Sequence, residues 1–320
     1  MERYILVVVL CFAWTHQAFS DGHDKWDYVL GGEHGPSKWG GDCQTGKKQT
    51  PIDIESIKTT WKKDLGTPTL TNYNEMPNVN FTAKNNGHTL TISFPEDVYN
   101  VSGIGLTGVY TTVQFHLHWG STNMKGSEHY LDGKQYAAEL HFVSYNTKYA
   151  NLSMAVTQPD GLAVLGVFMM VEGDNNTNYN FLKYAKDVIG KDTDKEGIAA
   201  FKLKGMLPTD LSKFFRYSGS LTTPDCFESV TWTVFKDPVK ISEYQMGLLR
   251  NLNDSNGVKM VDNFRPLLPV NDRTVYSSFN ISGQGATPPP TSEGPTADAT
   301  TVSMSAALFL LMLVAALFMH

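Results

Sequence analysis

The sequence predicts a mainly β, α+β fold: a single domain around a large, twisted, mostly antiparallel sheet with peripheral helices. Two observations predict it. Many short segments are rich in β-branched and aromatic residues and are bounded by Gly, Pro and Asn, which is typical of strands. The clearest of them read NVNFTAKNNG, HTLTISFP, YTTVQFHLHWG, QYAAELHFVSYN, LAVLGVFMMVEG and ESVTWTVFKDPV. Helical patterns, in contrast, are few.

Individual segments add detail to this prediction. LAVLGVFMMV is apolar on both faces, so we expect a central strand that is covered on each side. Helical periodicity covers residues 179–189 and 242–252. Ser242 precedes the second of these patterns and is expected to cap that helix.

Length and charge limit the function classes. A chain of 320 residues is long enough for one large domain, and no repeat or low-complexity linker interrupts residues 21–282. The formal net charge of −6 leaves no basic field to attract phosphates. We therefore expect no nucleic-acid partner.

Both ends of the chain are predicted to be processing signals. Residues 1–20 carry an apolar stretch before a small-residue cleavage site, which is typical of a signal peptide. Residues 283–303 are rich in Pro, Thr and Ser and predict a flexible stalk. The apolar tail within residues 304–320 is shorter than the ~20 residues that a spanning helix needs. This pattern predicts a glycosylphosphatidylinositol (GPI) attachment signal that is removed, and hence the extracellular face of the plasma membrane. A single short transmembrane helix is the alternative.

Secretion also sets the expectations for cysteines and asparagines. Cys11 belongs to the predicted signal peptide, so the mature chain keeps Cys43 and Cys226. In an oxidising compartment these two have one pairing open to them, and two free thiols are the alternative. Six N-x-S/T sequons predict glycosylated surface turns; they are Asn80, Asn100, Asn151, Asn175, Asn253 and Asn280.

The histidines of two predicted strands suggest a metal site. His116 and His118, in QFHLHWG, share one face of their strand, although an H-x-H pair alone is a weak signal. His141 lies in AELHFVSYN, and antiparallel pairing of the two strands brings it opposite that pair. Three neutral imidazoles leave one position of a tetrahedral zinc ion open, as in catalytic sites. Gln114 and Glu139 are each placed to orient a ligating ring.

Residues 26–280 closely resemble the α-class carbonic anhydrases. The resemblance rests on many separate motifs in the family's order, which are WDYVLGGEHGPSKWG, KKQTPIDI, NNGHTL, QFHLHWG, GSEHYLDG, AELHFVSYN, DGLAVLGVF, GSLTTPDC, VTWTVF and VDNFRPLLPVNDR. It implies Zn²⁺ held by His116, His118 and His141, and reversible hydration of CO2 to bicarbonate and a proton by a zinc-bound hydroxide. With the predicted terminal signals, the chain looks like a membrane-anchored extracellular member of the type IV or type XV kind.

The resemblance also implies roles for polar residues near the metal. Thr222, in SLTTP, resembles the threonine that accepts a hydrogen bond from the hydroxide and donates its own to a glutamate, here Glu128. Thr223 resembles a residue that positions bicarbonate or inhibitors. His88, in NNGHTL, matches the histidine that relays the proton to buffer, while Asn86 and Tyr28 resemble residues that order the water between.

Further expectations follow from the resemblance. The apolar wall for CO2 is implied for four residues, which are Val143, Val164, Leu221 and Trp232. Sulfonamides and anions are the expected inhibitors, and bicarbonate or proton transporters are the expected protein partners. Two alternative functions are a catalytically silent carbonic-anhydrase-like binding module and a zinc hydrolase of peptides or esters. The presence of all three histidines argues against the first, and the lack of an HExxH motif against the second.

Overall fold

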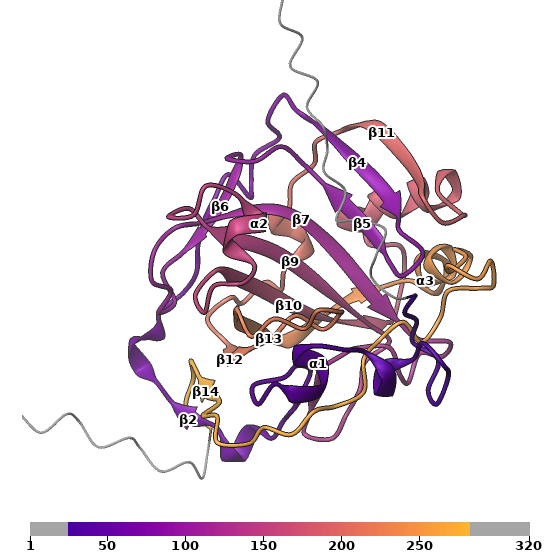
Figure 1. Cartoon of the computed structure of the whole chain (residues 1–320). Helices are drawn as coiled ribbons and strands as arrows, with labels where there is room; N and C mark the ends of the chain where they lie inside the picture. The colour runs from indigo at the N-terminus through magenta and orange to yellow at the C-terminus, as the bar shows by residue number, and fades with distance from the viewer. Residues whose placement is uncertain (1–24, 282–320) are drawn as a thin grey trace, which may run out of the picture. The chain divides into compact units, whose positions relative to one another are not determined.

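A sheet of twelve strands runs through residues 25–281, the part of the chain that the computed structural model describes (Figure 1). The order of its main path is β11-β4-β5-β7-β9-β10-β13-β12-β14-β2, and β3 and β6 pair beside β7. Its strands are β2 (Thr60–Trp61), β3 (Thr69–Thr71), β4 (Asn80–Asn85), β5 (Leu90–Ser93), β6 (Tyr99–Ser102), β7 (Tyr110–Trp119), β9 (Ala138–Asn146), β10 (Leu162–Val171), β11 (Thr193–Ala199), β12 (Phe214–Gly219), β13 (Val230–Ile241) and β14 (Tyr276–Ser277). A separate small sheet pairs β1 (Asp53–Ile54) with β8 (Tyr130–Leu131).

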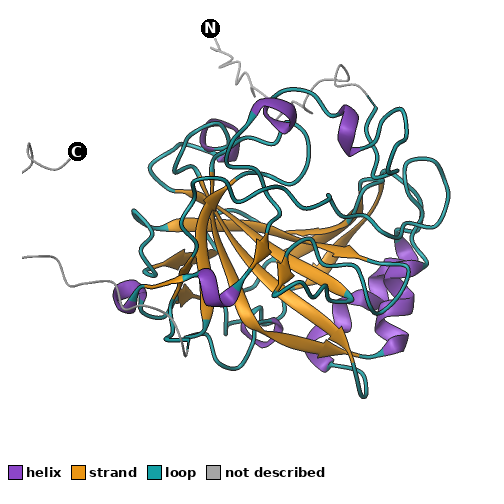
Figure 2. Cartoon of the chain, turned by 90° about the horizontal axis from the view of Figure 1, so that it is seen from below, coloured by secondary structure: helices purple, strands orange, loops and turns teal. Residues whose placement is uncertain are grey.

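The predicted fold class is confirmed. Within the large sheet only β10–β13 and β14–β2 pair in parallel, and the other described pairs are antiparallel. LAVLGVFMMV forms β10, which lies between β9 and β13 near the middle of the sheet, as its two apolar faces predict. The helices are short and lie around the sheet (Figure 2).

One of the two predicted helices is confirmed with its cap, and the other differs in helix type and in its first residue. Helix α3 (Glu243–Arg250) begins after Ser242, whose hydroxyl accepts a hydrogen bond from the backbone N–H of Gln245 at 3.1 Å. The side chain of Gln245 accepts in return from the backbone of Ser242, so the predicted cap is a full capping box. The pattern at 179–189 instead forms a 3-10 helix, η4 (Thr177–Asp187), which starts two residues earlier because Asn176 caps it.

The other helical segments are single turns. They are α1 (Asp42–Thr45), α2 (Leu152–Ala155), η1 (Pro36–Lys38), η2 (Ser56–Lys58), η3 (Lys63–Leu65) and η5 (Lys204–Met206). No helix among residues 25–281 is long and apolar enough to cross a membrane. The segments expected to be signal peptide, stalk and attachment signal (1–20, 283–303 and 304–320) lie outside the described residues.

The two faces of the sheet pack into two separate cores. The first core contains, among others, Phe115, Phe142 and Leu165, and the second contains Val143 and Val164. This division follows from strand alternation, since neighbours along β9 and β10 point to opposite faces. Strand β7 interrupts the alternation with a bulge, because its register with β9 shifts between Thr112 and Gln114.

A disulfide bond joins Cys43 and Cys226, the pairing predicted for them. Cys43 of α1 and Cys226 have Cα atoms 5.0 Å apart, and both pack against Trp39 in a small apolar cluster. The bond ties the N-terminal part of the domain to the loop that carries Thr222 and Thr223.

The disulfide closes a long loop, so removing the bond is expected to lower the free energy of unfolding considerably. The cysteines are 183 residues apart, for which the chain-entropy model gives roughly 5 kcal/mol as the upper value. We predict that the double variant Cys43→Ser/Cys226→Ser loses about 2–5 kcal/mol of unfolding free energy in urea titrations. Reduced wild-type protein serves as the control and should match the variant. A loss below 0.5 kcal/mol or so would contradict the prediction.

Candidate metal centre

Three histidines converge on one point at the middle of the sheet. His116 and His118 lie on β7, and His141 lies on β9 as the direct cross-strand partner of His116. The ring of His141 has its centroid 5.3 Å from that of His116 and 4.8 Å from that of His118. The two strands thus pair as the histidine pattern predicts.

Each of the three rings is held through one nitrogen. Nδ1 of His116 lies 3.0 Å from the side-chain oxygen of Gln114, and Nε2 of His141 lies 2.8 Å from Glu139. Nδ1 of His118 lies 2.7 Å from the backbone carbonyl of Asn263. These oxygens only accept, so the ring nitrogens donate and the opposite nitrogen of each ring keeps its lone pair. Gln114 and Glu139 therefore make the contacts predicted for them.

The three remaining nitrogens can hold one metal ion. One ligand atom from each histidine lies within 4.8 Å of the others. Nε2 of His118 is buried and has no hydrogen-bond partner, which is unfavourable unless something binds it. Imidazole nitrogens suit Zn²⁺ at Zn–N distances of about 2.0–2.1 Å, and three of them leave a fourth position open. The residues therefore fit a catalytic zinc ion.

Burial favours the neutral form of the His116 and His118 rings, which is the form that binds a metal. Burial, followed by the charges of His118 and His141, holds the pKa of His116 well below its usual range. Burial also lowers the pKa of His118. Because a protonated imidazole has no lone pair to give, these shifts extend metal binding to lower pH.

A second group of polar residues, next to the first, is a hydrogen-bonded chain. Oε1 of Glu139 lies 2.8 Å from Nε2 of His141 and 2.7 Å from Nδ1 of His129. Distances this short are direct hydrogen bonds and leave no room for an ion between the atoms. Burial acts to raise the pKa of Glu139, but the charges of the two histidines and their hydrogen bonds hold it well below its usual range. Glu139 is thus an ionised carboxylate that orients His141.

The hydrogen bond expected from Thr222 to Glu128 is not formed, and this expectation is corrected. One oxygen of Glu128 accepts from the backbone N–H of Arg265 at 2.9 Å. The other lies 3.4 Å from Nε2 of His118 and has no hydrogen-bond partner. The carboxylate is therefore turned toward Arg265 and the metal ligand. Thr222 is buried. It lies two positions after Ser220, in the loop that follows β12.

The residues expected to form the apolar wall lie together. Val143, Val164 and Trp232 belong to the second core, and Leu221 packs against it. The ring of Trp232 has its centroid 4.8 Å from that of His141. An apolar surface therefore borders the metal centre, as a small uncharged substrate requires.

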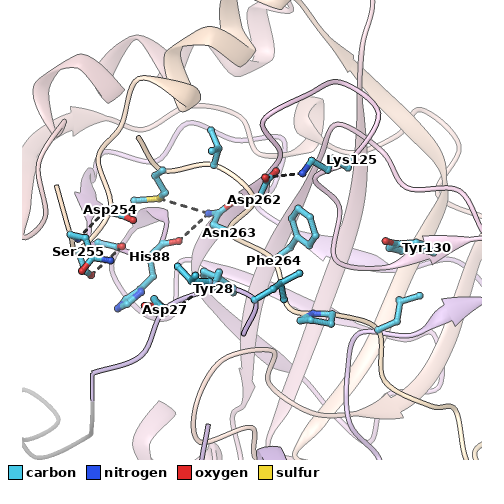
Figure 3. Close-up of a pocket in the computed structure, with 18 residues that line it drawn as sticks. Asp27, Tyr28, His88, Lys125, Tyr130, Asp254, Ser255, Asp262, Asn263 and Phe264 are labelled. Atoms are coloured by element: carbon cyan, nitrogen blue, oxygen red, sulfur yellow. Dashed lines mark hydrogen bonds and ion pairs between the residues drawn. The ribbon is translucent and has the colours of Figure 1, made fainter. Parts of the chain in front are cut away.

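His88 stacks against Trp26 beside a cavity of about 520 Å³. The ring centroids are 3.7 Å apart and the planes are nearly parallel. Figure 3 shows His88 beside Asp27 and Tyr28, with Asn263 donating to its backbone carbonyl. Burial, followed by the charge of Lys191, lowers the pKa of His88 to about 4. In this position the ring is neutral at pH 7 and accepts a proton weakly.

The two residues expected to order water have other contacts here. The side-chain oxygen of Asn86 accepts from the backbone N–H groups of His88 and Thr89, both at 2.9 Å, so it shapes the turn that carries His88. The ring of Tyr28 packs edge-on against Trp26 and Trp39. Burial, then the charge of Glu128, holds the pKa of Tyr28 well above its usual range, so its hydroxyl stays neutral.

Sequence reasoning missed four residues of the site. His129 follows Glu128 directly in the GSEHYLDG motif, and a buried charge beside a histidine could have pointed to it. Asn263 orients His118 through the backbone carbonyl of Asn263. Every residue has such a carbonyl, so the residue type does not indicate this role. Trp26 and Arg265 reach the site from distant segments, and although both lie in the motifs quoted above, neither was assigned a role there.

The metal centre yields a direct prediction. We expect His116→Ala to lower zinc affinity by at least about 100-fold, because two imidazoles bind a tetrahedral ion far less well than three. Competition with a chromogenic chelator measures the affinity. His34→Ala, which removes a half-buried histidine outside the triad, is the control and should bind zinc as the wild type does. Equal affinities in both variants would place the metal elsewhere.

The position of His88 yields a second prediction, on stability against pH. Its pKa is about 4 in the folded state and ~6.5 in the unfolded state, so only the unfolded state takes up this proton between those values. The stability from this position is complete above pH 6.5 and is lost as the pH falls toward 4. We expect His88→Gln to remove up to about 2 kcal/mol of the difference in unfolding free energy between pH 7 and pH 5. Identical pH dependence in both proteins would contradict the prediction.

Comparison with known proteins agrees with the geometry. Residues 34–279 match the family model of the eukaryotic-type carbonic anhydrases. Carbonic anhydrase 7 of Homo sapiens and that of Mus musculus are each 39% identical over 267 residues, which are 81% of this chain and 98% of those proteins. Putative carbonic anhydrase 5 of Caenorhabditis elegans is 36% identical over 276 residues, 85% of each chain. With a three-histidine zinc site on its central strands, the chain belongs to the eukaryotic-type carbonic anhydrase family.

Proposed function

We propose that this carbonic anhydrase hydrates CO2 at the extracellular face of the plasma membrane, to which a GPI anchor holds it, like the type IV or type XV enzymes. The observation that carries the chemistry is the convergence of three oriented imidazoles beside an apolar wall. The location rests on the sequences of the two ends of the chain and on the Cys43–Cys226 disulfide, a bond typical of oxidising compartments.

The chain's own residues divide the work of the reaction. A bound zinc ion lowers the pKa of the water that it holds, an effect for which carbonic anhydrases are themselves the reference case. Val143, Val164, Leu221 and Trp232 keep CO2 beside that position and exclude excess water. Gln114 and Glu139 hold the rings so that the geometry does not change during the reaction.

Thr222 orients the nucleophile in this proposal. Its hydroxyl can accept one hydrogen bond and donate another, so it can select the direction of a lone pair on the attacking oxygen. One buried oxygen of Glu128 accepts no hydrogen bond in this structure. This free acceptor supports the orienting role of Thr222, which needs a partner for its hydroxyl proton. Thr223 lies next in the same loop, where it can contact bicarbonate or an inhibitor.

His88 carries the proton from the site to buffer in this proposal. The relay requires the ring to leave its stack on Trp26, because burial there lowers its pKa to about 4. A ring turned toward water recovers a pKa near ~6.5 and can then exchange protons at neutral pH. Tyr28 and Asn86 border the path that the proton takes.

Activity measurements test this mechanism. We expect zinc-loaded wild type to hydrate CO2 and a sulfonamide to abolish that activity. His88→Ala should lower kcat in dilute buffer by roughly 10-fold or more, with kcat/KM little changed, because general acid–base transfer is lost while the nucleophile remains. Added imidazole should restore kcat. His34→Ala is the matched control. A kcat in His88→Ala equal to that of the wild type would refute the relay, and zinc-loaded protein without any activity would favour a silent binding module.

The location is supported by several features of the sequence. Four sequon asparagines are exposed, which are Asn80, Asn151, Asn175 and Asn280, and Asn100 and Asn253 are half-buried. Exposed sequons are the ones that a glycosyltransferase can reach on a secreted chain. At the membrane surface the enzyme would serve transporters of bicarbonate or protons by supplying or removing their substrate.

Release from cells tests the anchor. In cells that express the full chain, we expect phosphatidylinositol-specific phospholipase to release the processed protein, with its sulfonamide-inhibited activity, from the cell surface, because the phospholipase cleaves the lipid of a GPI anchor. Replacing residues 304–320 by a spanning helix of about 20 apolar residues gives a control that the phospholipase should leave on the membrane. Retention of the wild-type chain after treatment would favour the single transmembrane helix.

A further inference from the structure

A chain of buried hydrogen bonds leads from the ligand His141 away from the metal. Beyond Glu139, Nε2 of His129 lies 2.5 Å from the hydroxyl of Tyr217 on β12. That hydroxyl lies 3.2 Å from the hydroxyl of Thr50, which is far away in sequence. Tyr217 therefore bridges the histidine behind the metal ligand and a threonine of the N-terminal segment.

Thr50 in turn fixes the start of the loop that carries Thr222. Its hydroxyl accepts the backbone N–H of Ser220 at 3.0 Å, and its own backbone N–H donates to the hydroxyl of Ser220 at 3.0 Å. The carbonyl of Ser220 accepts the indole N–H of Trp232 at 3.0 Å. Ser220 precedes Thr222 by two positions, so these bonds locate the loop at its base.

The approach of Thr50 to β12 requires a glycine. A Cβ on Gly219 would lie 2.3 Å from the Thr50 hydroxyl and 2.8 Å from the Tyr217 ring. Both distances are far below van der Waals contact, so only glycine allows the hydroxyls to meet here.

A second arm extends the chain around the site as an open ring, whose last contact, between Glu128 and His118, is not a hydrogen bond. The guanidinium of Arg265 donates to the carbonyl of Thr50 and to the side chain of Gln49, both at 2.8 Å. The backbone N–H of the same arginine donates to Glu128, which lies 3.4 Å from the ligand His118. Every side chain of this ring is almost fully buried; the members are Gln49, Thr50, Glu128, His129, Glu139, Tyr217, Ser220 and Arg265. In such a dry network each bond restrains its neighbours, because water cannot replace a lost partner.

We propose that Tyr217 is a positioning residue whose hydroxyl couples the orientation of the metal ligand His141 to the placement of the loop 220–223. Loss of that hydroxyl frees His129 and Thr50 at once, and so loosens the metal ligand and the substrate loop together. The proposal rests on the zinc enzyme described above. A role in packing alone is the alternative, since the Tyr217 ring also stacks on Trp232 and lies under Arg273.

The variant Tyr217→Phe separates these two roles, because it keeps the ring and removes only the hydroxyl. We expect zinc dissociation into excess chelator to be at least ten times faster than in the wild type. We also expect the Kd of a fluorescent sulfonamide, measured on the zinc-saturated variant, to rise by a similar factor. Tyr179→Phe is the matched control, since it removes a buried hydroxyl that donates to the carbonyl of Met206 in the first core. It should change neither quantity.

A second pair of variants keeps the proposal testable if Tyr217→Phe does not fold. Thr50→Val should raise the sulfonamide Kd, whereas Thr50→Ser, which restores the hydroxyl, should return it to the wild-type value. If Tyr217→Phe or Thr50→Val matches the control in zinc dissociation and sulfonamide Kd, the coupling is overturned while the zinc site stands. Wild-type protein that retains no zinc would overturn the metal site and this proposal with it.

Discussion

The antiparallel ladder between β7 and β9 places His116 directly opposite His141, and every other feature of the site depends on that pairing. Backbone hydrogen bonds in the middle of a sheet are among the least mobile in a protein, because both strands are covered on each side. The ligands are therefore held in position before any metal arrives. Residues that orient the rings, such as Gln114 two positions before His116, gain their geometry from the same ladder.

Burial of polar groups is the second condition of this site. Almost no surface is exposed on five polar side chains at the middle of the sheet, where an unsatisfied polar atom costs about 1–3 kcal/mol; they are His118, His129, His141, Glu128 and Glu139. The structure satisfies most of them through one another: Glu139 serves both His141 and His129. Among these groups, the fully buried atoms without a hydrogen-bond partner are Nε2 of His118 and one oxygen of Glu128, which lie 3.4 Å apart beside the metal centre. The unfavourable desolvation is thus concentrated where a metal and a substrate can relieve it.

Local patterns predicted the parts of the molecule that depend on local rules. The alternation of side chains in QFHLHWG and AELHFVSYN led directly to the three ligands, to Gln114 and to Glu139. The cap at Ser242 also follows from its neighbours alone. The acceptor for His118 could not be predicted, because it is a backbone carbonyl 145 residues away.

Contacts between distant segments explain the remaining differences from the sequence-based predictions. The stack of Trp26 on His88 depends on the path of the N-terminal segment, and Glu128 bonds the backbone of Arg265 through one oxygen while its other oxygen has no hydrogen-bond partner. Neither arrangement follows from the spacing of residues. The motifs that revealed the family identified the residues that take part, and the tertiary structure decided how they contact one another.

The bulge in β7 shifts the alternation of side chains along this strand, so that positions before and after it point to different faces of the sheet. Before it, the hydroxyl of Thr112 meets Tyr73 and Ser144 on the side of the first core. After it, Val113 joins the second core and Gln114 begins the series that points to the metal. Without the extra residue, the strand could not present Thr112 to one face and His116 to the other. Deleting one residue here would leave every other side chain of β7 intact and still turn one part of the strand to the opposite face, so this enzyme depends on the number of residues in the strand as much as on their identity.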